Sequence, residues 1–209
     1  YDKSVLKKLL GLVVFILLVF VLTSVISTYR FYNSIFRLSY EEITSSLENT
    51  QVQCDKFSDC ELKPGDIIIR RYVTNVSELF NKLLNPYFTH SAFYLGDDEI
   101  FEAVGNYLPP KDQISITKLS KSDWFDKDME NFIIIRPKNY GEKLNLIIKN
   151  LKSVAEDPQY VFGPLNESKK TASCSDIILK YLLAKEIITD SSKRPEIITP
   201  DYLFWIMEK

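Results

Sequence analysis

The chain has 209 residues, of which 45% are hydrophobic and 26% are charged, and its formal net charge is −2. This balance is typical of one globular domain with appendages and excludes a largely disordered chain. The near-neutral charge without an obvious basic face argues against a nucleic-acid partner, and the absence of a G-x-G-x-x-G or Walker-type loop argues against a glycine-rich phosphate site.

Residues 1–30 differ from the rest of the chain. No charge occurs from Leu9 to Tyr29, and almost every residue from Leu9 to Leu22 is Leu, Val, Phe or Ile. A helix of about 20 apolar residues spans a bilayer core, whereas a helix buried in a soluble core normally keeps a polar face. We therefore predict that residues 1–30 form a membrane-inserting segment.

Lysines precede this apolar run and small polar residues close it, which is also the layout of a cleaved secretory signal. No A-x-A cleavage site follows, so a retained anchor is favoured. Lys3, Lys7 and Lys8 place the N-terminus in the cytoplasm by the positive-inside rule. The rest of the chain is then expected to be extracytoplasmic.

Three cysteines occur in the sequence. Cys54 and Cys60 enclose five residues and could close a disulfide, which would persist outside the cytoplasm. Cys174 would then be the odd, reactive thiol. A zinc site built from cysteines and His90 is the alternative, although structural zinc prefers ligand pairs two to four residues apart. We predict no metal.

Residues 31–60 are polar and mixed in character and are expected to form a stalk or a helical lead-in, followed by a single domain over residues 61–209. Short β-branched runs predict strands, and apolar residues at helical spacing predict helices. Strands with a few helices favour an α+β fold around a small antiparallel sheet. The expected strands are 67–71, 89–95, 99–104 and 132–136; the expected helices are 76–84, 141–155 and 173–184; and residues 105–131 and 157–170 are expected to be irregular.

His90 is the only histidine of the chain. If residues 96–98 form a three-residue hairpin loop, Leu95 pairs with Glu99 and the side chains of His90 and Glu102 become diagonal neighbours on one face. A carboxylate there fixes the imidazole tautomer and leaves the other nitrogen free to take a proton. A solvent-facing hairpin with an exposed carboxylate explains the pattern equally well.

Cys174 follows a helix-start signal. Ser173 is a good N-cap, and Asp176, three positions later, fits an aspartate variant of the capping box. Cys174 would lie in the first helical turn, where free N–H groups and the helix dipole stabilise a thiolate and could line an oxyanion hole. A small packing residue is the alternative. Together, Cys174, His90 and Glu102 are candidates for nucleophile, base and orienting group.

Five short motifs carry a resemblance to a known family. The chain resembles the circularly permuted papain-fold hydrolases of the YiiX type, which belong with the NlpC-type cell-wall peptidases, and is more distantly similar to the lecithin:retinol acyltransferase group. The motifs are Lys63-Pro-Gly-Asp-Ile67, Thr89-His-Ser-Ala-Phe-Tyr-Leu-Gly96, Ile100-Phe-Glu-Ala103, Ser173-Cys-Ser-Asp-Ile-Ile178 and Ile198-Thr-Pro-Asp201. The resemblance implies a permuted papain-like fold in which the nucleophile helix packs on the small sheet.

The same resemblance implies that His90 is the base, Glu102 the third polar member and Cys174 the nucleophile. Tyr160 is similar to a tyrosine that precedes the nucleophile helix in relatives and is a candidate for the substrate pocket, or a core tyrosine. Relatives often carry Glu where Asp176 stands, and the apolar anchor lies outside the shared domain.

The expected function is a membrane-tethered cysteine peptidase or amidase that works through a thioacyl intermediate, with cell-wall peptides as the implied substrate and no cofactor. Two alternatives stay open: a lipid acyltransferase or thioesterase of the same fold, and a catalytically inactive binding protein.

Overall fold

The computed structural model describes residues 3–34, 54, 56–71, 87–104, 113–122, 124, 131–138, 140–163, 165–189, 194–195 and 197–208. The chain divides into two compact units, Tyr1–Ile35 and Phe36–Lys209. The helix predicted over residues 76–84 and most of the predicted stalk lie outside the described residues.

The first unit is one long helix, α1, from Lys3 to Ser34. Its segment Leu10–Arg30 has 21 residues with a mean hydropathy of 2.9. At a rise of about 1.5 Å per residue, such a segment is about as long as a bilayer core is thick. The predicted N-terminal apolar helix is therefore present, with the length and composition of a membrane span or a signal sequence.

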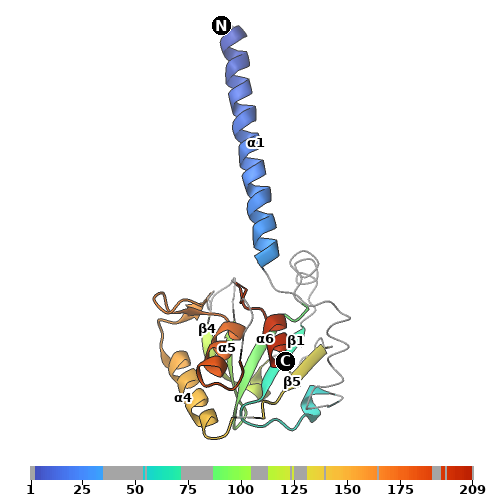
Figure 1. The fold of residues 1–209 in the computed structure, drawn as a ribbon, viewed down its shortest axis with the longest axis vertical. Coiled ribbons are helices and arrows are strands. Elements are labelled where there is room, and N and C mark those ends of the chain that lie inside the picture. The colour runs from blue at the N-terminus through green and yellow to red at the C-terminus, as the bar shows by residue number, and fades with distance from the viewer. Residues whose placement is uncertain are drawn as a thin grey trace. The chain divides into compact units, whose positions relative to one another are not determined.

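The second unit is an α+β domain built on an antiparallel sheet (Figure 1). The described strands of the main sheet follow the order β4-β3-β2-β1-β5. Their bounds are β1 Ile67–Arg71, β2 His90–Gly96, β3 Glu99–Val104, β4 Gln113–Lys118 and β5 Asn131–Ile135. The prediction that residues 105–131 are irregular was wrong for β4, whose alternating pattern is short and lacks strong turn signals.

Three helices contribute to the larger hydrophobic core, which lies on one face of the sheet. They are α4 Lys143–Glu156, α5 Cys174–Ala184 and α6 Pro200–Met207. Ile67, Ile69 and Phe93 contribute from the sheet to this core, and Ile177 and Leu182 contribute from α5. A short parallel pair, β6 Val161–Phe162 with β7 Thr171–Ala172, precedes α5 within and beside the segment expected to be a loop.

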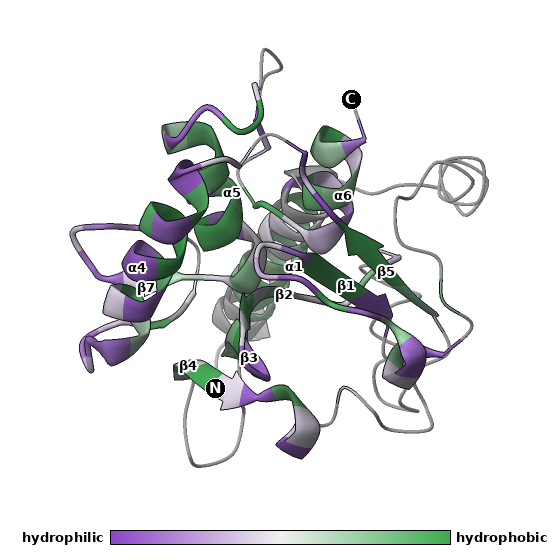
Figure 2. Cartoon of the chain, turned by 90° about the horizontal axis from the view of Figure 1, so that it is seen from below, coloured by the Kyte–Doolittle hydropathy of each residue, from purple (hydrophilic) through white to green (hydrophobic). Residues whose placement is uncertain are grey.

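A smaller core covers the opposite face of the sheet. It gathers Ile68, Ala92 and Ile100 from the strands, and Trp124 and Phe57 from outside them. Because both faces are covered, β1 and β5 are apolar along most of their length, whereas α4 has one apolar and one polar side (Figure 2).

The segment around Phe57 belongs to this globular unit. Phe57 is buried and packs against Trp124 and Phe132 with ring centroids 6.0 and 5.3 Å apart. Cys54 and Cys60 are joined by a disulfide and pack against the same core. Residues 56–60, which the prediction assigned to a stalk or helical lead-in, therefore belong to the globular unit, because Phe57 and the disulfide pack against its smaller core.

The β2–β3 hairpin differs from the prediction at its tip. Gly96 pairs with Glu99 around a two-residue turn, Asp97–Asp98, and both turn residues have positive φ (52° and 66°), as a type I′ hairpin turn requires. The predicted pairing of Leu95 with Glu99 was wrong. A register shift between Tyr94 and Gly96 then brings Tyr94 opposite Ile100, which is the register that the three-residue loop would have produced.

Two buried carboxylates fix the chain around the central strands. Asp66, with no exposed surface, accepts hydrogen bonds from Arg136 Nε and Nη2 (both 2.8 Å) and so joins the start of β1 to the end of β5. Asp201, in the first turn of α6, accepts from the backbone N–H groups of Tyr87 (2.7 Å) and Phe88 (2.8 Å). This contact holds the chain immediately before His90.

We expect Asp201→Asn to lower the free energy of unfolding by about 2 kcal/mol, because the amide –NH₂ would face a backbone donor and leave it unsatisfied in a buried site. Urea denaturation of the detergent-solubilised chain measures this change. Asp157→Asn, which removes a partly exposed carboxylate paired with Lys170, is the control and should cost under about 1 kcal/mol. Equal losses in the two variants would contradict the assigned role of Asp201.

Candidate functional site

Cys174 is the first residue of α5. Ser173 has extended backbone angles, and its Oγ accepts a hydrogen bond from the N–H of Asp176 at 3.3 Å. The carboxylate of Asp176 in turn accepts from Ser173 Oγ (2.8 Å) and from the N–H of Leu165 (3.1 Å). The cap therefore fixes where the helix begins, and it places the buried thiol of Cys174 in the first turn, at the positive end of the helix dipole.

His90 and Glu102 face each other across β2 and β3. His90 Nε2 lies 3.1 Å from Glu102 Oε2, and the two side chains are only 13% and 8% exposed. The indole Nε1–H of Trp124 donates to the same carboxylate oxygen at 3.2 Å, and its ring lies beside the imidazole with centroids 5.4 Å apart. Glu102 is thus held from two sides, and the imidazole plane is fixed.

His90 and Cys174 are electrostatically coupled. Burial alone would lower the pKa of His90, but the charge of Cys174 and hydrogen bonds to Cys174 and Glu102 outweigh it and raise that pKa to about 9. Burial alone would raise the pKa of Cys174, but the charge of His90 and hydrogen bonds from His90 and Ser91 lower it to about 7. Between these two values the pair exists as thiolate and imidazolium.

The ionised form of Glu102 is favoured by the same contacts. Burial opposes its charge, yet hydrogen bonding and charge from His90, with further hydrogen bonds from Trp124 and Thr117, hold the pKa of Glu102 below its usual range. The three predicted residues Cys174, His90 and Glu102 therefore form one connected charge system.

Tyr160 lies elsewhere. It immediately precedes β6, is half-buried against the larger core, and interacts with Lys180 and Tyr181 in the second half of α5. Tyr181 is seven residues after Cys174, or about 10 Å along the helix axis. None of the described contacts joins Tyr160 to the triad, so its role in substrate binding stays a prediction.

The disulfide between Cys54 and Cys60, with Cα atoms 5.4 Å apart, leaves Cys174 as the free cysteine. The alternative zinc site would need these sulfurs as thiolates. Within the described ranges, no group of three His, Cys, Asp or Glu side chains is arranged to hold a metal ion.

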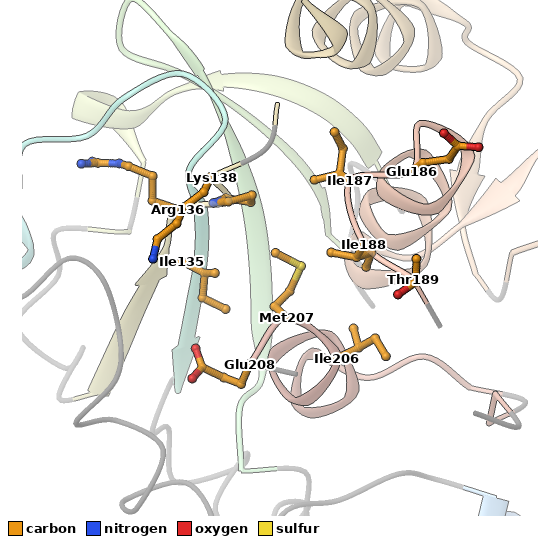
Figure 3. A pocket seen from close by; sticks show the side chains of 11 residues that line it. Ile135, Arg136, Lys138, Glu186, Ile187, Ile188, Thr189, Ile206, Met207 and Glu208 are labelled. Atoms are coloured by element: carbon orange, nitrogen blue, oxygen red, sulfur yellow. The ribbon is translucent and has the colours of Figure 1, made fainter. Parts of the chain in front are cut away.

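Two pockets lie away from the triad. One, of about 470 Å³, is bounded by the ends of β5, α5 and α6, where Ile135, Ile187 and Met207 surround the same space (Figure 3). The other, of about 390 Å³, lies along α5 near Leu165 and Arg194. Neither is lined by Cys174, His90 or Glu102, so hydrogen bonds and charge, rather than either pocket, define the candidate site.

Sequence reasoning missed three residues around the triad: Trp124, Ser91 and Ser175. Trp124 falls in a segment expected to be irregular, and its contact with Glu102 spans 22 residues. Ser91 and Ser175 each directly follow a triad residue, and their hydroxyls lie 3.0 Å apart in the structure. The sequence places these serines next to His90 and Cys174, which could have marked them as candidates. Nothing in the sequence indicates that the two hydroxyls contact each other.

No family model, curated protein or solved structure matches this chain. Any functional conclusion therefore depends on the geometry of the site itself.

We expect Glu102→Gln to lower the pKa of His90 by about one unit, equivalent to about 1.4 kcal/mol, because the neutral amide no longer stabilises the imidazolium. NMR titration of the imidazole measures this shift without ambiguity, since the chain has a single histidine. Glu99→Gln, on the same strand but paired with Lys118 and Lys152, is the matched control. A shift of equal size in both variants would argue against a specific pair.

Proposed function

We propose that the chain is a membrane-tethered cysteine hydrolase, a peptidase or amidase, with Cys174 as nucleophile, His90 as general base and acid, and Glu102 as the orienting group. The observation that carries this proposal is the hydrogen bond from His90 Nε2 to Glu102 together with the charge coupling of the same ring to the Cys174 thiol. A nucleophile, a base and a third group that orients the base are the parts that thiol catalysis needs.

The reaction follows from these contacts. With Nε2 bound to Glu102, Nδ1 is the ring nitrogen available to Cys174. The thiolate attacks the carbonyl carbon of the substrate, and the imidazolium gives its proton to the departing amine as the C–N bond breaks. Neutral His90 then takes a proton from water, the hydroxide attacks the thioester, and the C–S bond breaks to release the acid and regenerate the thiolate.

The start of α5 provides for the negative charge that develops on the carbonyl oxygen. First-turn N–H groups have no acceptor within their own helix. That of Asp176 is bound by Ser173 Oγ, which makes the N–H groups of Cys174 and Ser175 the candidates for an oxyanion hole.

The proposed fold is a permuted papain-like domain. Support comes from the chain order His90, Glu102, Cys174, from the antiparallel sheet that carries the first two, and from the packing of α5 against β2. The proposed location is extracytoplasmic at a membrane surface. Its support is the apolar helix α1 and the disulfide near residue 57, which an oxidising compartment would preserve.

Acyl transfer to a lipid acceptor is the second candidate, because α1 would hold the site beside lipid substrates. Transfer and hydrolysis share the thioacyl step and differ only in whether water or another nucleophile attacks it. A scaffold used only for binding would lack the reactive thiolate.

The alkylation rate of Cys174 should rise with pH through about 7 and then level off, because only the thiolate reacts. In His90→Ala the midpoint should move up by at least about one unit, which slows alkylation at pH 7 at least about fivefold. Iodoacetamide kinetics on the detergent-solubilised chain measure both values, and the disulfide leaves one thiol to follow. If the midpoint equals that of a model cysteine and does not change in His90→Ala, the mechanism is contradicted and the binding scaffold is favoured.

Incubation with a short-chain thioester should release free thiol with wild-type protein and not with Cys174→Ala. We expect the acyl group to appear as free acid when the chain is a hydrolase, even with lysolipid or amine acceptors present. Chromatography of the acyl products makes the distinction. Acyl lipid as the main product would instead establish the transferase, with the same nucleophile.

A further inference from the structure

A buried pair of serine hydroxyls connects the two halves of the candidate site. Ser91 follows His90 on β2, Ser175 follows Cys174 on α5, and both are fully buried. Their Oγ atoms lie 3.0 Å apart. Neighbouring side chains on the same surfaces are apolar: Phe93 two residues after Ser91, and Ile178 three residues after Ser175. Hydroxyls in such a setting are costly to bury unless they are hydrogen-bonded.

The pair has one proton more than its mutual hydrogen bond uses. Each hydroxyl has one donor, and the bond between the two serines occupies one of them. The remaining proton has an acceptor close by, since Cys174 Sγ lies 3.8 Å from Ser175 Oγ and Ser91 also hydrogen-bonds to the thiol. Whichever serine accepts in the mutual bond can therefore donate to sulfur.

The hydrogen bond between the two serines also joins α5 to strand β2. Along β2, the His90 ring lies beside Trp124 of the smaller core, while the hydroxyl of the next residue, Ser91, meets Ser175 of α5. The Ser91–Ser175 hydrogen bond therefore fixes the start of the nucleophile helix on the strand that carries the base.

We propose that Ser91 and Ser175 form a hydroxyl relay that donates a hydrogen bond to the Cys174 thiolate and positions the start of α5 against β2. This inference rests on the proposed function, and it adds two positioning residues to the site. A hydrogen bond to a charged acceptor is stronger than one to the neutral thiol, so the relay favours the ionised nucleophile.

The other charged groups near Cys174 have separate roles. His90 faces the thiol from β2, and Glu102 on β3 lies behind the imidazole. On α5 itself, the carboxylate of Asp176 turns to Ser173 and Leu165. The serine pair is thus a contribution to thiolate stability that is distinct from the imidazolium.

The test is the pH midpoint of Cys174 alkylation in the full chain, compared among wild type, Ser91→Ala, Ser175→Ala and the double variant. The double variant should raise the midpoint by about one unit, which slows alkylation about tenfold below the midpoint. Each single variant should raise the midpoint by a smaller amount, because the remaining hydroxyl lies close to the sulfur and has its proton free to donate. Ser175→Thr, which keeps a hydroxyl, should restore the wild-type midpoint.

Ser120→Ala is the control, since this hydroxyl donates to Asp98 at the hairpin tip. Midpoints in both single variants equal to wild type would overturn the relay, as would a single shift as large as that of the double variant or a raised midpoint in Ser175→Thr. If Ser91→Ala does not fold, Ser175→Ala and Ser175→Thr decide the question alone. A low wild-type midpoint that depends on His90 but not on the serines would refute the relay and leave the proposed function intact. A wild-type midpoint equal to that of an unperturbed cysteine would refute both the relay and the proposed function.

Discussion

The carboxylate of Glu102 imposes a constraint that organises the whole site. A buried ionised carboxylate needs hydrogen bonds and opposite charge in compensation. Here the donors are the indole of Trp124 and the imidazole of His90. The positive charge of the His90 imidazolium stabilises the ionised carboxylate of Glu102, and the same charge stabilises a thiolate at Cys174. The ionisation of Cys174, the proposed nucleophile, is thus linked to the burial of a carboxylate on β3.

The sheet makes this linkage possible because both of its faces are covered. The face that contains Glu102 and His90 is closed by the smaller core, where Phe57 packs on Trp124. The opposite face is covered by helices, including α5 with Cys174. Burial on both faces lowers the local dielectric, which strengthens hydrogen bonds and charge coupling among the three groups.

Buried carboxylates also explain why short polar motifs occur beside apolar strands. Asp66 accepts the two hydrogen bonds of Arg136 and the N–H of Lys63 (2.7 Å), which closes the turn before β1. Asp201 accepts two backbone N–H groups just before β2. These side chains hold the ends of β1 and β2, and rigid strand ends are what a site needs in order to keep its hydrogen-bond geometry.

Short-range sequence patterns are sufficient to predict the local features of this protein. The apolar run of α1, the four predicted strands that the structure contains, the amphipathic α4 and the Ser173 cap of α5 all follow from patterns within a few residues. The contact between His90 and Glu102 could also be predicted from the sequence, because one hairpin contains both residues and a short turn sets its register.

Which distant residues complete the site depends instead on how the whole domain packs. Trp124 reaches Glu102 across a segment with no periodic signal, and Ser91 meets Ser175 across 84 residues. The place of Phe57 in the smaller core and of β4 at the sheet edge depend in the same way on surfaces supplied by other segments. Local patterns state which face of an element is buried, but they do not state which partner covers it, because packing depends on shape and volume summed over the whole fold.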